Sequence, residues 1–277
     1  MPMTRSPIHF VAGLPRSGST LLAAILRQNP RFRADVTSPV AALIDGLQPR
    51  MGSGTEFAPF FDDERRTRIL RGLFALYHGP AEQGSVLFDT NRTWTARMSL
   101  IGELFPDARV ICLVRDVGWI LDSVERVLKN NPTRTSRALA FQNGGSVYAR
   151  VANMMNHDTG LVGSAWAALR EAWYGEHASR MIVIEYDRLV ANPREIMGAL
   201  YAALDEAPFE HDFAHLAFDT PEYDEGLGMP GLHRIRPRVA AMQRRPSIPP
   251  DLFVKYVGAS FWKEAEATTA GPRILKA

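Results

Sequence analysis

The residues best suited to chemistry lie in a short loop, GLPRSGST, at positions 13–20. The loop follows the apolar run IHFVA and precedes LLAAIL, so it stands between an expected strand and an expected helix. The first N–H groups of such a helix have no partner within it and point at one place, which makes an anion site. The loop adds hydroxyl donors, a small residue and a permanent cation, namely Ser17, Ser19, Thr20, Gly18 and Arg16. A tight turn capped by a serine is the plainer alternative.

The loop differs from that of the nucleotide triphosphatases. Their pattern, G-x-x-x-x-G-K-[ST], places a lysine on the terminal phosphates and a hydroxyl on magnesium. Here Ser19 follows Gly18 directly, and the cation is Arg16. The sequence PRSGST instead resembles the 5′-phosphosulfate loop, P-[KR]-S-G-[ST]-[ST], of the sulfotransferases that use 3′-phosphoadenosine-5′-phosphosulfate (PAPS). The resemblance implies that the loop holds the 5′-phosphosulfate and that Arg16 stabilises charge on the departing phosphate.

A second stretch, RVICLVRDVGWILDSVERV, resembles the part of that family which binds the 3′-phosphate. The family has an arginine at a strand end and a serine eight residues later, and Arg115 and Ser123 stand at this spacing. Two turns of helix bring Ser123 back over the strand end. Hydrogen bonds to charged groups contribute about 1.5–3 kcal/mol each, so two of them favour PAPS over ATP by roughly a hundredfold to ten-thousandfold. By itself, an arginine at a strand end is more often a surface or structural residue.

Further stretches extend the resemblance over residues 8 to about 205. FPDARVICLVRD and VIEYDRLVANP are similar to two family signatures, and Tyr186 is expected either to face the nucleotide or to close a strand in the core. In GLHRIRPRVAAMQRR, His233 and Arg234 fit the place near the sulfuryl group and the 3′-phosphate. The other arginines of that stretch either attract an anionic acceptor or form a plain basic surface; they are Arg236, Arg238, Arg244 and Arg245.

The sequence is less clear about the acceptor side. In the tyrosylprotein branch a glutamate follows the loop by about twenty residues, where this chain has Val36 and Thr37. Asp35 is the nearest carboxylate and is the candidate general base, unless it is a capping or surface residue. In FDTNRTW, Arg92 is a candidate cation for the transferring group, fixed by Asp89 or Asn91, unless Asp89 caps the next helix and Arg92 lies on the surface. The expected catalytic residues are Arg16, Asp35, Arg92 and His233.

The expected fold is α/β, with a P-loop-type parallel sheet flanked by helices in three layers, as in the family that the chain resembles. Apolar runs predict strands at 8–12, 86–89, 109–114 and 181–186. Helices are predicted at 18–29, 63–78, 93–105, 116–128, 161–178 and 193–204. We expect one domain over 1–277, in which 129–145 is a mobile lid or a surface excursion and 206–277 is irregular and completes the site.

Composition and charge further limit the class of protein to which the chain can belong. The 32 basic and 30 acidic residues give a formal charge of +2, too small for a general nucleic-acid binder. Cys112, the single cysteine, lies in the apolar run VICLV and is expected to be a buried, reduced thiol. No apolar stretch reaches the roughly 18–20 residues that span a membrane, and no targeting signal is evident. These features predict a cytoplasmic protein of undetermined oligomeric state.

The resemblance therefore implies a metal-independent sulfotransferase that uses PAPS and a hydroxyl acceptor: a peptide tyrosine, a glycan or a small molecule. A P-loop kinase is one alternative, in which VLFD at 86–89 would bind magnesium and ATP. A non-catalytic module that binds 3′-phosphoadenosine-5′-phosphate is another.

Overall fold

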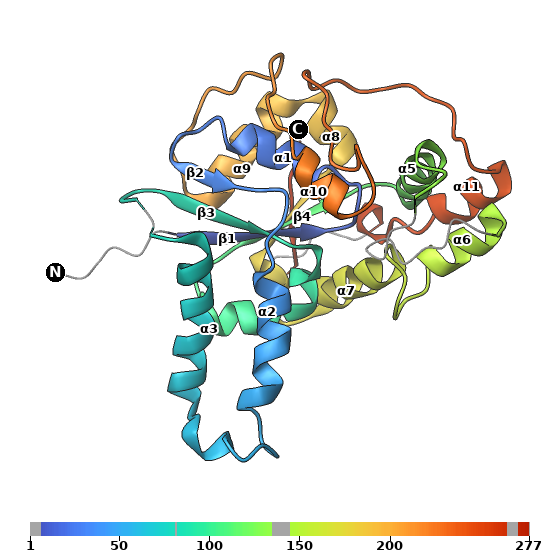
Figure 1. Cartoon of the computed structure of the whole chain (residues 1–277). Helices are drawn as coiled ribbons and strands as arrows, with labels where there is room; N and C mark the ends of the chain where they lie inside the picture. Colours follow the sequence, from blue (N-terminus) through green and yellow to red (C-terminus); the bar gives the residue numbers. More distant parts are fainter. Residues whose placement is uncertain (1–6, 81, 135–144, 265–270, 277) are drawn as a thin grey trace.

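The computed structural model describes residues 7–80, 82–134, 145–264 and 271–276 (Figure 1). Six strands form one sheet in the order β2-β3-β1-β4-β5-β6, and every neighbouring pair is parallel. In sheet order the strands are β2 (Phe32–Ala34), β3 (Val86–Thr90), β1 (Ile8–Gly13), β4 (Val110–Val114), β5 (Met181–Glu185) and β6 (Arg273–Ile274). The four predicted strands are confirmed. The two outer strands escaped prediction because they have only three and two residues.

Helices connect the strands and cover both faces of the sheet, which confirms the predicted α/β class (Figure 1). They are α1 (Ser19–Leu26), α2 (Val40–Leu47), α3 (Asp63–His78), α4 (Met98–Leu104), α5 (Val117–Asn130), α6 (Val147–Met154), α7 (Gly163–Tyr174), α8 (Tyr186–Ala191), α9 (Pro193–Leu204), α10 (Pro221–Gly226) and α11 (Pro250–Val257). The helix predicted at 93–105 is divided, since a 3-10 segment, Arg92–Arg97, precedes α4.

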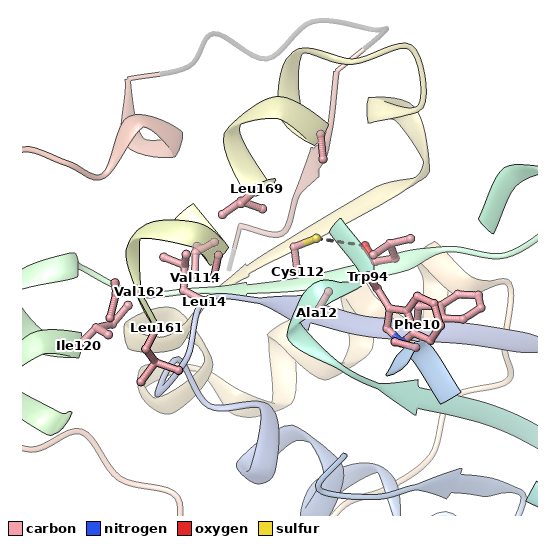
Figure 2. Close-up of a cluster of buried hydrophobic side chains, with 14 of the residues drawn as sticks. Phe10, Ala12, Leu14, Trp94, Cys112, Val114, Ile120, Leu161, Val162 and Leu169 are labelled. Carbon is pink, nitrogen blue, oxygen red and sulfur yellow. Dashed lines mark hydrogen bonds between the residues drawn. The ribbon is translucent and has the colours of Figure 1, made fainter. Parts of the chain in front are cut away.

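Alternate residues of the central strands pack into two separate cores. In β4, Val110, Cys112 and Val114 belong to the core beneath α4, α5 and α7, whereas Ile111 and Leu113 belong to the core beneath α1 and α9. Figure 2 shows the first core, with Cys112 between Leu169 and the Trp94 and Phe10 rings. Burial raises the pKa of the Cys112 thiol. The strands are therefore apolar on both faces, as strands of a covered parallel sheet are.

The parallel pairing of β1 with β4 fixes the start of the GLPRSGST loop. Gly13 lies opposite Leu113 and has φ 105°. A Cβ at this position would lie 2.2 Å from the carbonyl oxygen of Leu113. Only glycine fits this close approach, and the loop therefore begins at the carboxyl edge of the sheet.

The remaining sequence expectations concern the lid and the C-terminal part. Residues 135–144, most of the expected lid, lie outside the described residues; α5 covers its first two positions. The C-terminal part holds α10, α11 and β6, which weak periodicity did not reveal. Within the described residues, no helix is long and apolar enough to cross a membrane. Nor does that part of the chain bring together three or more His, Cys, Asp or Glu side chains in a way that would hold a metal ion.

Candidate active site

A cavity of ≈ 1260 Å³ lies at the carboxyl edge of the sheet, around the loop after β1. Its wall includes every predicted site residue except Ser17: Arg16, Gly18, Ser19, Thr20, Asp35, Arg92, Arg115, Ser123, Tyr186, His233 and Arg234. The carboxyl ends of parallel strands share one edge, and this brings distant segments to a single place.

The backbone of the loop is open toward the cavity. The N-cap of α1 is Gly18, with φ 100° and no side-chain cap. The Ser17 hydroxyl is fully buried and lies against the carbonyl oxygens of Leu14 and, at 2.9 Å, Leu113. Ser17 therefore holds the loop to β4 and does not offer its hydroxyl to a ligand. A Cβ at Gly18 would lie 2.8 Å from Cδ2 of Tyr186, so that ring covers the loop.

The Arg16 side chain connects the loop with the second predicted phosphate-binding stretch, which contains Arg115 and Ser123. Its backbone is left-handed, with φ 58°. Its Nε donates to Ser123 Oγ at 3.2 Å, and its guanidinium also donates to the carbonyl of Leu232. Burial lowers the pKa of Arg16, and the nearby charge of Arg115 lowers it further. The structure thus places the two predicted phosphate-binding elements in direct contact.

Three arginines converge beside Ser123. The guanidinium of Arg115 lies 4.2 Å from the centre of the Tyr186 ring, and its buried Nε has no hydrogen-bond partner in the described part of the chain. Burial lowers the pKa of Arg115. Arg244 stacks on Trp119 at 4.8 Å and pairs with the buried carboxylate of Asp122. Its charge lowers the pKa of both Arg16 and Arg115. The sequence placed Arg244 only in a general basic stretch.

His233 forms a pair with Asp224, which sequence reasoning missed. The Asp224 carboxylate is buried, accepts from the backbone N–H of His233 at 2.8 Å and lies 2.6 Å from its Nδ1. A carboxylate only accepts, so Nδ1 carries the proton and Nε2 is left for a substrate. Burial lowers the pKa of His233; Asp224 opposes this, and the charges of Arg16 and Arg92 reinforce it.

Arg92 and Asp35 line the cavity, and Asp89 is not the partner of Arg92 that was expected. Arg92 lines the cavity, and its partial burial among the cavity residues lowers its pKa. Asp89 does not fix Arg92 and does not cap the next helix: it is fully buried and accepts from Ser38 and Trp94. Asn91 caps the 3-10 segment instead. The Ser38 hydroxyl reaches Asp89 because the backbone N–H of Ser38 donates to the carbonyl of Thr90, at the end of β3.

Asp35 is exposed on the same wall. Its Oδ1 accepts from the backbone N–H of Val36 at 2.8 Å. No ion pair joins it to a cation in the described ranges, whereas Asp45, on the same wall, pairs with Arg97. Asp35 therefore has neither the burial nor the oriented partner that distinguishes His233.

A parallel sheet with a helix N-terminus and a cluster of arginines at its carboxyl edge is suited to an anionic ligand. The chain belongs to the sulfotransferase family, whose model matches residues 7–211. The family resemblance inferred from residues 15–20, 115 and 123 is thereby confirmed. The match ends before Asp224, His233 and Arg244, which the C-terminal part contributes.

Solved structures share this fold. The sulfotransferase domain of the olefin synthase from Synechococcus PCC 7002 is 17% identical, with a TM-score of 0.52, over 96% of this chain and 98% of that one. A sulfotransferase from Alicyclobacillus acidocaldarius is 15% identical, with a TM-score of 0.50, over 81% of this chain and 90% of that one. No match was found among curated protein sequences. At these identities the likeness establishes the fold and leaves the substrates open.

Proposed function

We propose that this sulfotransferase moves the sulfuryl group from PAPS to a hydroxyl acceptor. The observation that carries the proposal is the buried Nε of Arg115, which has no hydrogen-bond partner among the described residues and belongs to the same cavity wall as Ser123. Arg16 and Arg244 bring two more cations to the same place. Three carboxylates act on these arginines: Asp122, which pairs with Arg244, Asp224, which pairs with His233, and Asp187. A 3′-phosphate carries the charge and the acceptor oxygens that this cluster lacks, and ATP has no such group.

The donor would occupy two subsites, one for its 5′ end and one for its 3′-phosphate. Arg16, the loop N–H groups, Ser19 and Thr20 would hold the 5′ end, while Arg115, Ser123 and Arg244 would hold the 3′-phosphate. Arg234 lies on the same wall, and Tyr186 covers the loop from the nucleotide side. PAPS, when bound, supplies the sulfuryl group and a phosphate as leaving group. Arg16 is placed to stabilise the charge that develops on that phosphate.

The acceptor hydroxyl needs a base, and the structure favours His233 over Asp35. His233 is half-buried, is oriented by Asp224 and has a lowered pKa, so its Nε2 is unprotonated and ready to accept a proton at neutral pH. Arg92 stands on the same wall and would support charge on the transferring group. A peptide tyrosine is the first acceptor to test, before glycan and small-molecule hydroxyls. A cytoplasmic location stays a prediction.

Thermal-shift titration with the 3′,5′-bisphosphate and with ATP, each with and without magnesium, tests the donor. The bisphosphate at a hundred times its Kd should stabilise the protein by about 2.7 kcal/mol, without magnesium. Stabilisation by ATP and magnesium alone would contradict the proposal and support a kinase. Bisphosphate binding without PAPS consumption by any acceptor would support a non-catalytic module.

Arg115→Gln tests the 3′-phosphate subsite directly. The variant should bind the bisphosphate about 10- to 100-fold more weakly, because one or two charge-assisted hydrogen bonds are lost. Its affinity for adenosine 5′-phosphate, which has no 3′-phosphate, should change little. Isothermal titration calorimetry measures both affinities, with the exposed Arg68→Gln on α3 as the control. Equal losses for the two nucleotides would remove Arg115 from the subsite.

A further inference from the structure

The cavity wall also includes residues just before helix α2 and in the last turn of helix α3; this part of the wall is called the arm end. The helices α2 and α3 run away from the sheet side by side (Figure 1). Asp35 precedes α2, and Tyr77 lies in the last turn of α3. Both side chains line the cavity, as does Tyr223. Tyr77 is 48% exposed and Tyr223 is 37% exposed, so two aromatic residues and a carboxylate are available to a ligand.

The buried carboxylate of Asp89 holds the two ends of this helical arm together. Ser38, just before α2, donates to Asp89 at 2.7 Å, and His78, at the end of α3, lies 2.7 Å from it. The backbone N–H of Ser38 also donates to the carbonyl of Thr90 at 2.8 Å. Asp35 lies three residues from one anchored position, and Tyr77 is adjacent to the other. Their relative placement is therefore fixed before a ligand arrives.

Charge is distributed unevenly along the cavity. Arg16, Arg115 and Arg244 gather at the nucleotide end. At the arm end, Asp35 forms no ion pair within the described residues. Its charge reaches Tyr77, whose pKa is raised by burial and then by Asp35 and Asp89. Arg92 lies in the same cavity and its charge acts on His233 and Tyr223, but among the described residues it forms no ion pair with Asp35.

We infer that the acceptor is a hydroxyl compound that carries a protonated amine, and that the ammonium group binds against Asp35 and the Tyr77 ring. The acceptor hydroxyl lies at His233, and Tyr223, whose ring centre is 5.3 Å from that of His233, flanks the body of the molecule. A carboxylate attracts the ammonium by charge, and an aromatic face attracts it through the ring quadrupole. This inference rests on the proposed function, since it describes the acceptor of the same reaction.

Three phenols of similar shape and different charge test the inference. They are tyramine, para-ethylphenol and phloretate, which are cationic, neutral and anionic at neutral pH. We measure binding of each to the full-length protein saturated with the 3′,5′-bisphosphate, by calorimetry, and then turnover of each with PAPS. Tyramine should bind about five- to tenfold more tightly than para-ethylphenol, and phloretate more weakly than either. Equal binding of tyramine and para-ethylphenol would overturn the inference.

Variants of Asp35 and Tyr77 test whether these residues cause the tighter binding of tyramine. Asp35→Asn should remove the advantage of tyramine while the binding of para-ethylphenol stays the same. Glu56→Gln, an equal charge change at an exposed position outside the cavity wall, should leave the advantage intact. Tyr77→Phe should retain tyramine binding, and Tyr77→Leu should weaken it about two- to fivefold, because only the second change removes the ring. A loss of affinity for all three phenols in Asp35→Asn would show a structural role and contradict the inference.

The two proposals fail in different ways. If tyramine keeps its binding advantage but no phenol or other acceptor consumes PAPS, the sulfuryl transfer is wrong and the ammonium site stands. If para-ethylphenol is sulfated as efficiently as tyramine, the transfer stands and the ammonium site is wrong.

Discussion

At the scale of single residues, environment decides what His233 can do. An ordinary histidine has a pKa of about 6.5. Burial lowers the pKa of His233, and two arginine charges act in the same direction against the opposing Asp224. The imidazole is therefore neutral over a wider pH range than an exposed histidine, and its Nε2 remains a base at mildly acidic pH.

The pH profile of kcat/KM tests this role. Activity should fall as the pH drops through the pKa of His233, with an apparent pKa below about 6.5. Asp224→Asn removes the charge that raises this pKa, so the acid limb should move to still lower pH while the rate falls. His233→Ala should lower kcat by about 10²- to 10⁴-fold. A variant of Asp224 whose acid limb moves upward, or a His233→Ala enzyme with full turnover, would exclude His233 as the base.

At the scale of elements, α5 and the C-terminal segment 240–249 complete the arginine cluster together. Asp122, fully buried on α5, accepts from the Ser247 hydroxyl at 2.7 Å and from Arg126 at 3.1 Å, and it pairs with Arg244. Lys129, farther along α5, donates to the carbonyl of Ser247 at 3.1 Å. Burial alone would raise the pKa of Asp122, but the Ser247 hydrogen bonds and the two arginine charges outweigh it and lower the pKa.

Asp122→Asn should therefore affect both stability and nucleotide binding. Loss of the buried charge leaves Arg244 without its partner, and breaking such a pair costs about 3–5 kcal/mol of folding free energy. Because Arg244 is no longer held on Trp119, the affinity for the 3′,5′-bisphosphate should fall about tenfold. Glu125→Gln is the matched control, since Glu125 is equally buried on α5 but pairs with Arg150 outside the cavity wall. Calorimetry should show weaker nucleotide binding in the first variant and unchanged binding in the second.

At the scale of the whole molecule, burial of a titratable group in β1 links folding to pH. His9 is 5% exposed, and burial, with a smaller effect of Arg109, lowers its pKa to about 4. In the unfolded chain the same imidazole takes up a proton at about pH 6.5. The free energy of unfolding therefore falls as the pH drops from about 6.5 to about 4, because only the unfolded state binds the proton over that range.

Urea unfolding at about pH 7 and about pH 5 measures this effect. The free energy of unfolding should fall by about 2 kcal/mol more in the parent protein than in His9→Asn, which has no group that titrates there. Asparagine can still accept from the backbone N–H of Arg109, as His9 Nδ1 does. His215→Asn, at an exposed histidine, should keep the pH dependence of the parent. An unchanged dependence in His9→Asn would show that other groups cause the acid destabilisation.

The sequence alone predicted those parts of the site that depend on residues close together in the chain. The glycine, hydroxyl and arginine positions of residues 13–20 follow from the geometry of one strand-to-helix turn. The spacing of Arg115 and Ser123 follows from two turns of one helix, and Figure 1 shows both elements at the same edge of the sheet. Long apolar runs likewise gave the four central strands, because strands covered on both faces must be apolar along their length.

Tertiary structure alone decided which side chains meet across long separations. It paired His233 with Asp224, placed Arg244 beside Arg115 and buried Asp89 between Ser38 and His78. It also turned the Ser17 hydroxyl away from the cavity. A carboxylate or an arginine has the same local pattern whether it caps a helix, lies on the surface or lines a site. Its charge state and partners are set by burial and by segments that only the folded chain brings together.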